Sequence, residues 1–258
     1  MAVRMIAVDM DGTFLDENKQ YNVQRFSRQY ALLKEKGIHF VVASGNQYYQ
    51  LQRYFPDIKN EIAFVAENGA WVSHGDEVIF CGELAKERVH SVLDILAREP
   101  DISVVVCGRK SAYVHASMPD SVIGMLKNHY YRLEKRDNLY DIDDTVFKFS
   151  LNLAHEGIES LMTRLHTQLG EIDHIMHPVS SGYGFIDLII PGCHKAHGIA
   201  LLQQNGALAI VKWWLSATAR MISRCYVRPA LVLQWPMRVR LSRLSRVLKP
   251  RVIRTRAP

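Results

Sequence analysis

The stretch that decides the fold is MIAVDMDGT, residues Met5–Thr13. Its first four residues are apolar, and they lead directly into two carboxylates separated by a single residue. This pattern predicts a buried parallel strand that ends in Asp9 and Asp11. Ligands of an open α/β sheet bind at the carboxyl ends of its strands, so the two carboxylates are expected at a binding edge.

The residues after this stretch alternate between predicted helices and strands. Asn22 can cap a helix over residues 23–36, and Gly37 ends it. Apolar runs at residues 38–43 and 62–66 predict a second and a third strand. The short connections between them predict the α/β class, with a Rossmann-like, doubly wound parallel sheet.

Two further groups are candidates for binding an anion. The second predicted strand ends in Ser44, and residues 44–46 are expected to begin a helix that runs to about residue 54. At the start of this helix, the Ser44 hydroxyl and the free backbone amides can hold an anion. Simple capping of the helix by Ser44 is the alternative. Lys195 stands at the start of another predicted helix, where its charge opposes the helix dipole unless an anion binds nearby; a solvated lysine is the alternative.

The pattern changes beyond residue 70. A hairpin over residues 70–81 precedes pairs of strands separated by single helices, with one helix over residues 121–131 and one strand near residues 174–179. This arrangement predicts an α+β module over residues 83–182, inserted into the parallel domain.

The chain is expected to return to the core after this module. Residues 185–190 (FIDLII) have the pattern of a buried core strand, and residues 195–204 have that of a helix. We therefore expect a core domain that comprises residues 1–82 and 183–204. Residues 205–258 are expected to form a poorly ordered C-terminal tail.

The composition is that of a globular protein. A chain of 258 residues with 48% apolar content can bury a sizeable core. No apolar run approaches the roughly 18 residues of a membrane span, and the N-terminus lacks a charged start followed by an apolar signal region, so we expect a cytoplasmic protein that does not act at a membrane. The four cysteines are widely spaced, without a CxxC pair, and are expected to be reduced thiols.

The net charge of +6 is unevenly distributed along the sequence. Residues Asn205–Pro258 contain twelve of the 32 Lys and Arg residues and none of the 26 Asp and Glu residues, and the last carboxylate of the chain is Asp187. One interpretation is a tail that binds nucleic acid or another anionic surface. Against it, the tail has neither helical periodicity nor the Gly/Ser composition of a linker.

The two carboxylates at the end of the first strand suit phosphoryl chemistry. Asp9 can attack phosphorus and form an aspartyl-phosphate, while Asp11 can protonate the leaving alcohol and then activate water. Asp9 and the backbone carbonyl of Asp11 can also hold Mg²⁺, which neutralises charge on the phosphoryl oxygens. A surface loop with two acidic residues is the alternative; the preceding strand and the following Gly12-Thr13 favour a functional site.

Three motifs together resemble the haloacid dehalogenase superfamily: VDMDGT, which ends at Thr13, ASGN at Ala43–Asn46 and HKAHGI at His194–Ile199. The ENGA stretch at Glu67–Ala70 and the size of the inserted module resemble the Cof-type sugar phosphatases with a C2-type cap. The resemblance covers about residues 1–204. It implies Mg²⁺-dependent hydrolysis of small phosphorylated metabolites, such as sugar phosphates and nucleotide or flavin monophosphates.

The resemblance also implies roles for single residues. Asp9 is implied as the nucleophile, Asp11 as the acid and base, and both as ligands of Mg²⁺. The residues implied to bind the phosphate or the substrate are Met10, Ser44, Gly45 and Lys195. The resemblance does not identify the substrate. Four cap residues remain open between packing, surface and substrate contact: His115, His129, Tyr130 and Tyr131.

The fourth motif of the family is missing from the sequence. Cof-type proteins have a Gly-Asp-x-x-Asn-Asp stretch after the third motif, and its first Asp completes the Mg²⁺ shell. The corresponding window here reads VKWWLSATARMIS (Val211–Ser223), and no carboxylate follows Asp187. We therefore expect weakened Mg²⁺ binding, impaired activity and a core sheet that lacks the strands of the family beyond residue 204.

The codons compatible with the tail point to a frameshift near residues 204–205. When the third base of each codon is read with the first two bases of the next, Trp213-Trp214 must give Val and Met221-Ile222 must give Asp. The codons permitted between them allow Gly-Asp-Ser-Ala-Asn, which matches the missing motif. The expected protein is thus an impaired phosphatase; an inactive truncated remnant and an anion-binding or nucleic-acid-binding protein with a basic tail are the alternatives.

Overall fold

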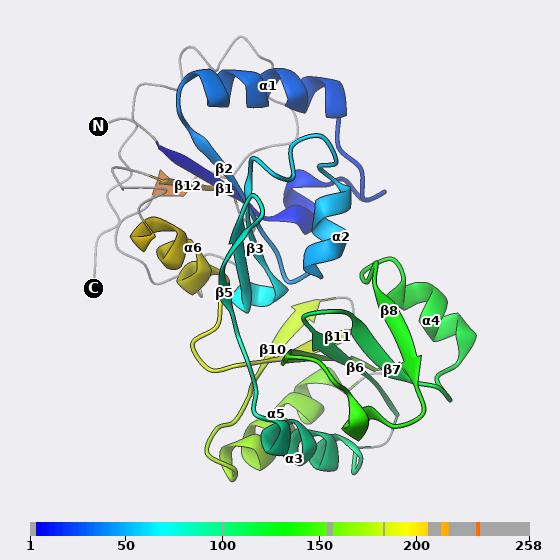
Figure 1. Ribbon diagram of the computed structural model, residues 1–258. Helices are drawn as coiled ribbons and strands as arrows, with labels where there is room; N and C mark the ends of the chain where they lie inside the picture. Colours follow the sequence, from blue (N-terminus) through cyan, green and yellow to red (C-terminus); the bar gives the residue numbers. More distant parts are fainter. Residues whose placement is uncertain are drawn as a thin grey trace.

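The computed structural model describes residues 4–99, 101–153, 157–182, 184–205, 213–216 and 231–232. These residues form two domains with one β-sheet each (Figure 1). The chain leaves the first domain, which we call the core, near residue 82 and returns to it near residue 190. The domain between these two points is called the cap. The predicted division into a core and an inserted α+β module thus describes the architecture.

The core sheet contains seven strands in the order β13-β12-β1-β2-β3-β4-β5. Their bounds are β1 Met5–Val8, β2 His39–Ala43, β3 Ala63–Ala66, β4 Trp71–His74, β5 Glu77–Cys81, β12 Trp213–Ser216 and β13 Leu231–Val232. The strands from β13 to β3 are parallel, whereas β4 and β5 run antiparallel to their neighbours. The carboxyl ends of β1 and β2 therefore meet at one edge, as the sequence predicts.

Helices cover both faces of this sheet. They are α1 (Val23–Glu35), α2 (Tyr48–Arg53) and α6 (Lys195–Gln204). Ala7 and Val41 point to the face that packs against α6, whereas Phe40 and Val42 point to the face that packs against α1 and α2 (Figure 1). Because both faces are covered, consecutive residues of the central strands are apolar.

Helix α1 begins where the sequence predicts and ends one residue earlier than predicted. The side chain of Asn22 accepts a hydrogen bond from the backbone amide of Arg25, which caps the helix. Gly37 follows the helix with φ of +60°, a conformation that glycine adopts without steric cost.

The start of α2 differs from the prediction. The helix begins at Tyr48, and residues 44–46 form a loop before it. The carbonyl oxygens of this loop accept hydrogen bonds from other segments: from Asn68 N to Ser44 O, from Lys148 Nζ to Gly45 O and from Glu67 N to Asn46 O. These carbonyl oxygens accept tertiary hydrogen bonds and not the hydrogen bonds of a helix. The expectation that the helix begins at Ser44 is therefore wrong. We call residues 44–46 the phosphate loop, after the role proposed below.

The cap sheet contains six strands in the order β10-β11-β9-β6-β7-β8. Their bounds are β6 Ile102–Gly108, β7 Ala112–His115, β8 Leu133–Arg136, β9 Val146–Leu153, β10 His177–Gly182 and β11 Phe185–Ile189. The cap helices are α3 (Lys86–Leu96), α4 (Asp120–Leu126) and α5 (Ile158–Gly170). Helices α3 and α5 lie on the side of the cap sheet that faces away from the core (Figure 1). Strand β8 was not predicted, and α4 ends earlier than predicted.

Strand β11 corrects the predicted domain boundary. It lies in the cap sheet, antiparallel to β9 and β10, so the expectation that FIDLII is a core strand is wrong. Ile186 and Leu188 pack under α3 and α5, whereas Asp187 faces the core and accepts a hydrogen bond from Asn68. A strand covered by helices on one side and by a second domain on the other is as continuously buried as a parallel core strand. The cap therefore extends to about residue 190.

The strands β12 and β13 correct a second expectation. β12 pairs in parallel with β1, with Ser216 level with Val8, and β13 pairs with β12. The core sheet is thus extended beyond β1 by backbone that follows residue 204, contrary to the prediction. The outer edge of β1 carries amide and carbonyl groups that need hydrogen-bonding partners, and a short apolar segment can supply them. The expected poor order of the remaining tail concerns positions outside the described residues.

Two further expectations can be compared with the described residues. Cys81, Cys107 and Cys193 are free thiols, as predicted, whereas Cys225 lies outside the described residues. No helix in the described part of the chain combines the length and the apolar character that a membrane crossing requires.

Candidate active site

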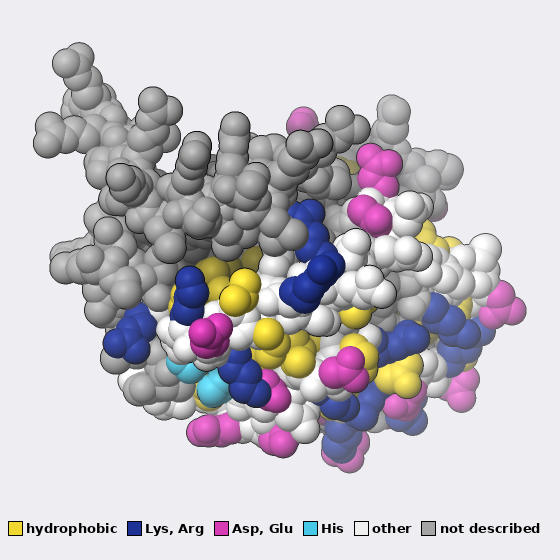
Figure 2. Space-filling model, turned by 90° about the horizontal axis from the view of Figure 1, so that it is seen from above, with side chains coloured by type: hydrophobic (Ala, Val, Ile, Leu, Met, Phe, Trp, Pro, Cys, Tyr) yellow, Lys and Arg dark blue, Asp and Glu magenta, His cyan; other side chains and the backbone are white. Residues whose placement is uncertain are grey.

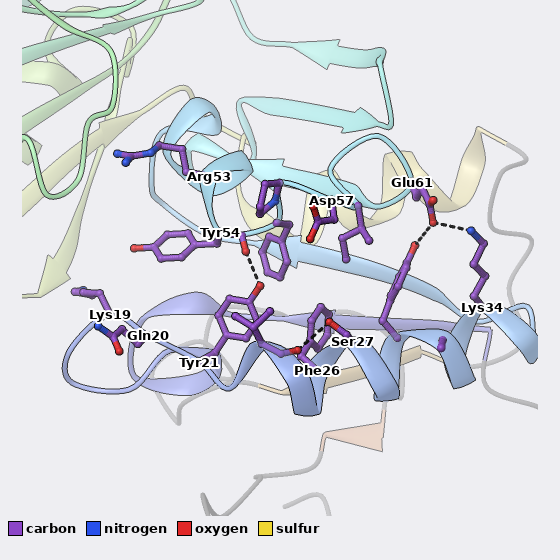
Figure 3. A pocket seen from close by; sticks show the side chains of 16 residues that line it. Lys19, Gln20, Tyr21, Phe26, Ser27, Lys34, Arg53, Tyr54, Asp57 and Glu61 are labelled. Atoms are coloured by element: carbon purple, nitrogen blue, oxygen red, sulfur yellow. Dashed lines mark hydrogen bonds and ion pairs between the residues drawn. The ribbon is translucent and has the colours of Figure 1, made fainter.

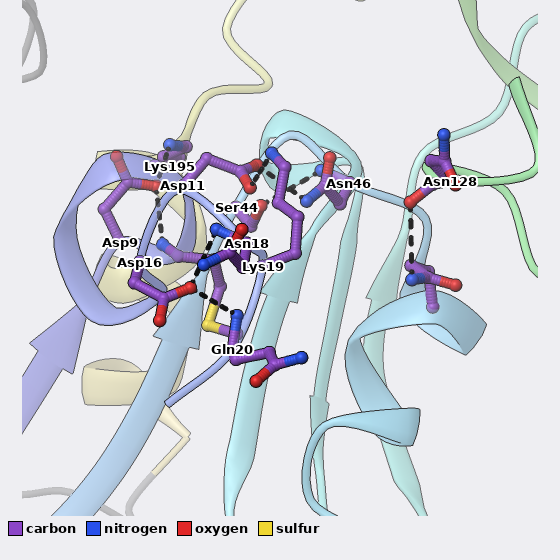
Figure 4. Close-up of polar contacts among 12 residues, drawn as sticks. Asp9, Asp11, Asp16, Asn18, Lys19, Gln20, Ser44, Asn46, Asn128 and Lys195 are labelled. Carbon is purple, nitrogen blue, oxygen red and sulfur yellow. Dashed lines mark hydrogen bonds and ion pairs between the residues drawn. The ribbon is translucent and has the colours of Figure 1, made fainter. Parts of the chain in front are cut away.

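The two predicted carboxylates lie at the carboxyl end of β1 (Figure 4). The backbone turns sharply after Asp9, with hydrogen bonds from Phe14 N to Asp9 O (3.1 Å) and from Leu15 N to Met10 O (2.9 Å). Gly12 has φ of +67° in this turn, where an L side chain is strained, although no atom would obstruct a Cβ there. The glycine of the DxDGT motif therefore serves the backbone conformation that brings Asp9 and Asp11 to the same edge.

Lys195 reaches Asp9 from the far end of the sequence. Its Nζ lies 2.9 Å from Asp9 Oδ1, and only 19% of the lysine side chain and 13% of the aspartate side chain are exposed. The backbone amide of Met10 donates to the same oxygen at 3.0 Å. The Met10 side chain is fully buried in the core, so the predicted contact of Met10 with a substrate can involve only its backbone.

The phosphate loop lies beside these carboxylates. Ser44 is buried, and its hydroxyl oxygen accepts a hydrogen bond from Asn46 N at 3.1 Å. Asn46 Nδ2 donates to Asp11 Oδ2 at 2.8 Å, which ties the loop to the second carboxylate (Figure 4). A Cβ on Gly45 would meet Asn68 Oδ1 at 2.8 Å, so a larger residue here would displace the Asn68 side chain. All six sequence-predicted site residues thus come together at one sheet edge.

Lys19 is a site residue that the sequence did not reveal. Its Nζ lies 2.6 Å from Asp11 Oδ1. It is presented by a tight loop in which the Asp16 carboxylate accepts hydrogen bonds from the amides of Asn18 and Gln20, both at 2.9 Å, while Lys19 itself has φ of +57° (Figure 4). An Asp-x-Asn turn of this kind is visible in the sequence, but the direction of the lysine is not.

The four open cap residues occupy different places. His129 packs against Phe185 with ring centroids 5.6 Å apart, and burial lowers its pKa, with a further contribution from the positive charge of Lys19. This makes His129 a cap residue beside the site. The others are not part of it: the His115 side chain is exposed, Tyr130 is buried in packing, and Tyr131 is exposed with the Arg53 guanidinium 4.5 Å from its ring centre.

The donor set fits Mg²⁺ only in part. Mg²⁺ is commonly held by one or two carboxylates together with other oxygens, such as those of waters and substrate phosphates, and the Asp9 carboxylate with the Asp11 backbone carbonyl can provide two such oxygens. Among the described residues, no group of three or more His, Cys, Asp or Glu side chains could hold a metal ion. The carboxyl end of β12 lies level with that of β1, yet the sequence after Ser216 contains no carboxylate. The ion would therefore rest on two aspartates.

A groove of about 630 Å³ lies next to this site, between α1 and the segment over residues 53–61 (Figure 3). Five aromatic side chains line it together with polar and charged ones. Two of the polar groups contact Glu61: Lys34 Nζ lies 2.9 Å from its carboxylate, and Tyr30 donates to the same carboxylate at 3.1 Å. On the face that carries α1, side chains of both charge signs are interspersed with small apolar groups (Figure 2). The groove does not include the two carboxylates, so we do not assign chemistry to it.

The sequence is similar to those of known hydrolases. A model of the haloacid dehalogenase-like hydrolases matches residues 6–210. The 5-amino-6-(5-phospho-D-ribitylamino)uracil phosphatase YbjI of Escherichia coli (strain K12) is 48% identical over 204 residues, which are 79% of this chain and 74% of the relative.

Solved structures show the same fold. A protein from Streptococcus mutans UA159 is 27% identical, with a TM-score of 0.77 over 84% of this chain and 81% of its own. The HAD subclass IIB sugar phosphatase BT4131 is 14% identical, with a TM-score of 0.66 over 83% of this chain and 80% of its own, and at this identity the likeness concerns the fold alone.

Proposed function

The chain belongs to the haloacid dehalogenase-like hydrolase family, and from this premise we propose that it hydrolyses small phosphate monoesters with Asp9 as the nucleophile and Asp11 as the acid and base. The family and its phosphatase relative make it a phosphoric monoester hydrolase. One observation carries the assignment of residues. Three separate segments converge at one sheet edge: Lys195 contacts Asp9 at 2.9 Å. Asn46 donates to Asp11 at 2.8 Å and to the Ser44 hydroxyl oxygen at 3.1 Å, and so links these two residues.

The first half of the proposed reaction transfers the phosphoryl group to Asp9. Met10 N and Lys195 Nζ both contact Oδ1, so attack through Oδ2 forms the Oδ2–phosphorus bond without breaking either contact. The bond from phosphorus to the ester oxygen breaks, and the protonated Asp11 carboxyl gives its proton to the leaving alcohol. Lys195 and the Ser44 hydroxyl are placed to bind the non-bridging oxygens of the phosphate.

The second half releases the phosphate. The Asp11 carboxylate takes a proton from a water molecule, the water oxygen bonds to phosphorus, and the bond to Asp9 breaks, which returns both aspartates to their starting states. Lys19 and Asn46 hold the two oxygens of Asp11 in place for both proton transfers. When bound by Asp9 and the Asp11 carbonyl, Mg²⁺ supplies charge neutralisation at the phosphoryl oxygens.

The proposed substrates are sugar phosphates and related phosphorylated metabolites, including flavin-type and nucleotide monophosphates. The Escherichia coli relative is named for a phosphorylated ribityl-uracil, which is a polyol phosphate joined to a heterocycle. His129 and Phe185 offer a ring and an aromatic face beside the site, which suits such a substrate. A cytoplasmic location is part of the same proposal.

Replacement of Asp9 by Asn tests the assignment. Asp9→Asn removes the attacking oxygen and is expected to lower kcat for p-nitrophenyl phosphate by roughly a thousand-fold or more. Asp76→Asn, at an exposed position in the turn between β4 and β5, is the matched control and should keep the wild-type rate. A folded Asp9→Asn protein that keeps full activity would exclude Asp9 as the nucleophile.

We also propose that the gene carries a frameshift near residues 204–205 and that activity is below that of an intact relative. In support, the family model ends its match at residue 210, close to the proposed change of frame, and the sequence has no carboxylate after Asp187. Sequencing across codons 200–215 tests this. A one-base correction that restores Gly-Asp-x-x-Asn-Asp supports the proposal, whereas a confirmed sequence together with Mg²⁺-dependent turnover equal to that of an intact relative refutes it.

A further inference from the structure

The turn over residues 67–69 lies between the phosphate loop and the cap. Glu67 and Asn68 have φ of +51° and +58°, in the left-handed region that non-glycine residues rarely occupy, and Gly69 has φ of +104°. The two strained residues donate their backbone amides to the phosphate loop, Glu67 to Asn46 O and Asn68 to Ser44 O, each at 3.1 Å. Strain of this kind persists only where the surroundings hold the backbone in place.

One cap side chain holds both the turn and the phosphate loop. Lys148 on β9 places its Nζ 2.6 Å from Glu67 Oε2 and 2.8 Å from Gly45 O. Only 1% of the Lys148 side chain and 2% of the Glu67 side chain are exposed. A buried ammonium of the cap thus links two segments of the core, one of which is the loop that lies beside Asp11.

A second cap side chain holds the neighbouring residue of the turn. Asp187 on β11 accepts hydrogen bonds from Asn68 Nδ2 at 2.7 Å, from the Ser150 hydroxyl at 2.7 Å and from the Ser181 hydroxyl. Asp187 is buried, and the Asn68 side chain that it holds packs directly over Gly45. The position of the Asn68 amide relative to the phosphate loop therefore depends on the cap.

A third contact joins the cap to the residue that follows the loop. Gln47 Nε2 donates to Arg132 O at 2.8 Å, and Arg132 N donates to Gln47 Oε1 at 2.9 Å. Gln47 is buried and precedes the first turn of α2. The segment from Gly45 to Gln47 is thus held by the cap at both of its ends.

The buried charges make a partial separation of these contacts costly. Burial acts to lower the pKa of Lys148, but the carboxylates of Glu67 and Asp187 raise it well above its ordinary value. Burial raises the pKa of Glu67, although Lys148 acts in the opposite direction. A buried charge without its partner is costly, so a partly separated cap would leave Glu67 unbalanced until water enters. The contacts therefore favour two states, docked and dry or open and hydrated.

We propose that Lys148 and Asp187 are positioning residues, which tie the phosphate loop to the cap through Glu67 and Asn68 so that the loop takes its catalytic geometry only when the cap is docked. The proposal rests on the function proposed above, because it assigns the loop to phosphate binding. Lys148 and Asp187 touch core residues that hold the loop, and they act on the reaction through that loop. The loop is proposed to contact the phosphoryl oxygens more strongly in the transition state than in the bound substrate, so the loss of either residue should lower turnover much more than it weakens the binding of a small substrate.

The test compares the wild-type protein with Lys148→Met and with the control Lys135→Met, a half-exposed lysine of the cap that pairs with Asp120. Two quantities are measured: hydrogen exchange of the Glu67 and Asn68 backbone amides relative to those of β2 and β3, and kcat and KM for p-nitrophenyl phosphate. Lys148→Met is expected to speed exchange at both amides about tenfold or more and to lower kcat by about 10-fold to 100-fold, with KM within about twofold of wild type. Lys135→Met should match the wild type in both.

The opposite results overturn the proposal. The proposal is wrong if Lys148→Met shows wild-type hydrogen exchange at both amides, or if it keeps the wild-type kcat. It is also wrong if the variant raises KM and leaves kcat unchanged. If Lys148→Met does not fold, the double variant Glu67→Gln/Lys148→Met removes the two charges of this ion pair, with Asp187 retained, and is judged by the same outcomes. A wild-type protein without hydrolysis refutes the proposed function, while the exchange comparison still decides whether Lys148 holds the turn.

Discussion

One carboxylate oxygen of Asp9, the proposed nucleophile, contacts both a backbone amide and an ammonium. The amide comes from the next residue, and the ammonium of Lys195 comes from the start of α6. Both donors fix the direction in which the other oxygen points. At the scale of single residues, the site therefore depends on a contact between two distant segments as much as on the DxDGT turn.

Removal of the Lys195 charge should impair the reaction without unfolding the protein. Lys195→Met takes away a cation that we propose faces the phosphoryl group in the transition state, and we expect kcat/KM to fall by about 100-fold. Steady-state kinetics with p-nitrophenyl phosphate measure the change. Lys36→Met, at an exposed position after α1, is the control and should leave the rate unaffected. A rate within twofold of wild type for Lys195→Met would show that this lysine does not act on the phosphate.

The ion pair between Glu99 and Arg164 should make stability depend on pH. Arg164 donates to Glu99 Oε2 at 2.7 Å and 3.1 Å, and these hydrogen bonds lower the pKa of Glu99 although burial opposes them. A carboxyl with a lowered pKa in the folded state stabilises the protein above its ordinary pKa, and this contribution disappears as the pH falls through the lowered value.

Arg164→Met measures this contribution. The urea midpoint of the variant should lie below that of the wild type near pH 7. The difference should shrink as the pH falls below the ordinary pKa of a glutamate and through the lowered pKa of Glu99, because protonated Glu99 no longer gains from the arginine. Arg88→Met, an exposed arginine of α3, is the control and should follow the wild type at each pH. A difference that stays the same at low pH would mean that Arg164 stabilises the protein by packing alone.

The residues of the site were predictable to different degrees. Asp9, Asp11 and Ser44 could be placed because the carboxyl ends of neighbouring parallel strands meet at one edge, and this rule needs only the strand pattern. Lys19 and Lys148 could not, since the contact of each depends on how a long side chain is directed by a loop or by a second domain. Such contacts leave no periodicity in the sequence.

At the scale of elements, the turn over residues 67–69 connects three parts of the molecule. A Cβ on Gly69 would lie 2.4 Å from His194 O, in the segment that leads into α6. The turn thus contacts the phosphate loop, the cap and the start of the helix that carries Lys195. Because the contact at Gly69 is with backbone, it cannot be relieved by a change of rotamer.

Substitution of Gly69 should be costly for this reason. Gly69→Ala adds a methyl group against backbone at a φ of +104°, and we expect a loss of about 1–3 kcal/mol in the free energy of unfolding. Gly124→Ala is the control, because this glycine lies inside α4 and an added methyl group would have no atom within 4 Å; it should gain about 0.5–1 kcal/mol. Urea unfolding measures both. Equal effects of the two variants would contradict the close approach at Gly69.

The bounds of a helix or strand were predictable where its own residues determine its burial pattern. They were not predictable where the burial depends on contact between the two domains. Helix α1 could be bounded from its cap and its glycine. Strand β11 could not be assigned to the correct sheet, because the core covers the side that the cap helices leave open. Residues 44–46 have the sequence of a helix start, and only the tertiary hydrogen bonds to their carbonyls explain the loop.

At the scale of the whole molecule, the strand that carries Asp9 lies inside the core sheet. Its neighbours are β2, close in sequence, and β12, more than two hundred residues away in register with it. A chain that ended after α6 would leave the outer edge of β1 without its paired strand.

Truncation after residue 205 should therefore destabilise the core. Without β12 and β13, the amide and carbonyl groups along β1 become an open edge, and such edges promote association between chains. We expect a lower urea midpoint and, in sedimentation velocity, a larger share of associated species than for the full-length chain at the same concentration. A truncated protein with the same midpoint and the same sedimentation profile would show that β12 contributes little to the sheet.

The buried pair of Glu67 and Lys148 restricts how the two domains can evolve. The counter-charge of a buried core carboxylate is supplied by the cap, so a cap grafted from another protein would have to bring an ammonium to the same point. The chain crosses between core and cap at two points that look like ordinary hinges. The two domains are nevertheless not interchangeable modules. A substitution at Glu67 restricts which residues can later be accepted at Lys148, and the two halves of the protein are expected to diversify in step.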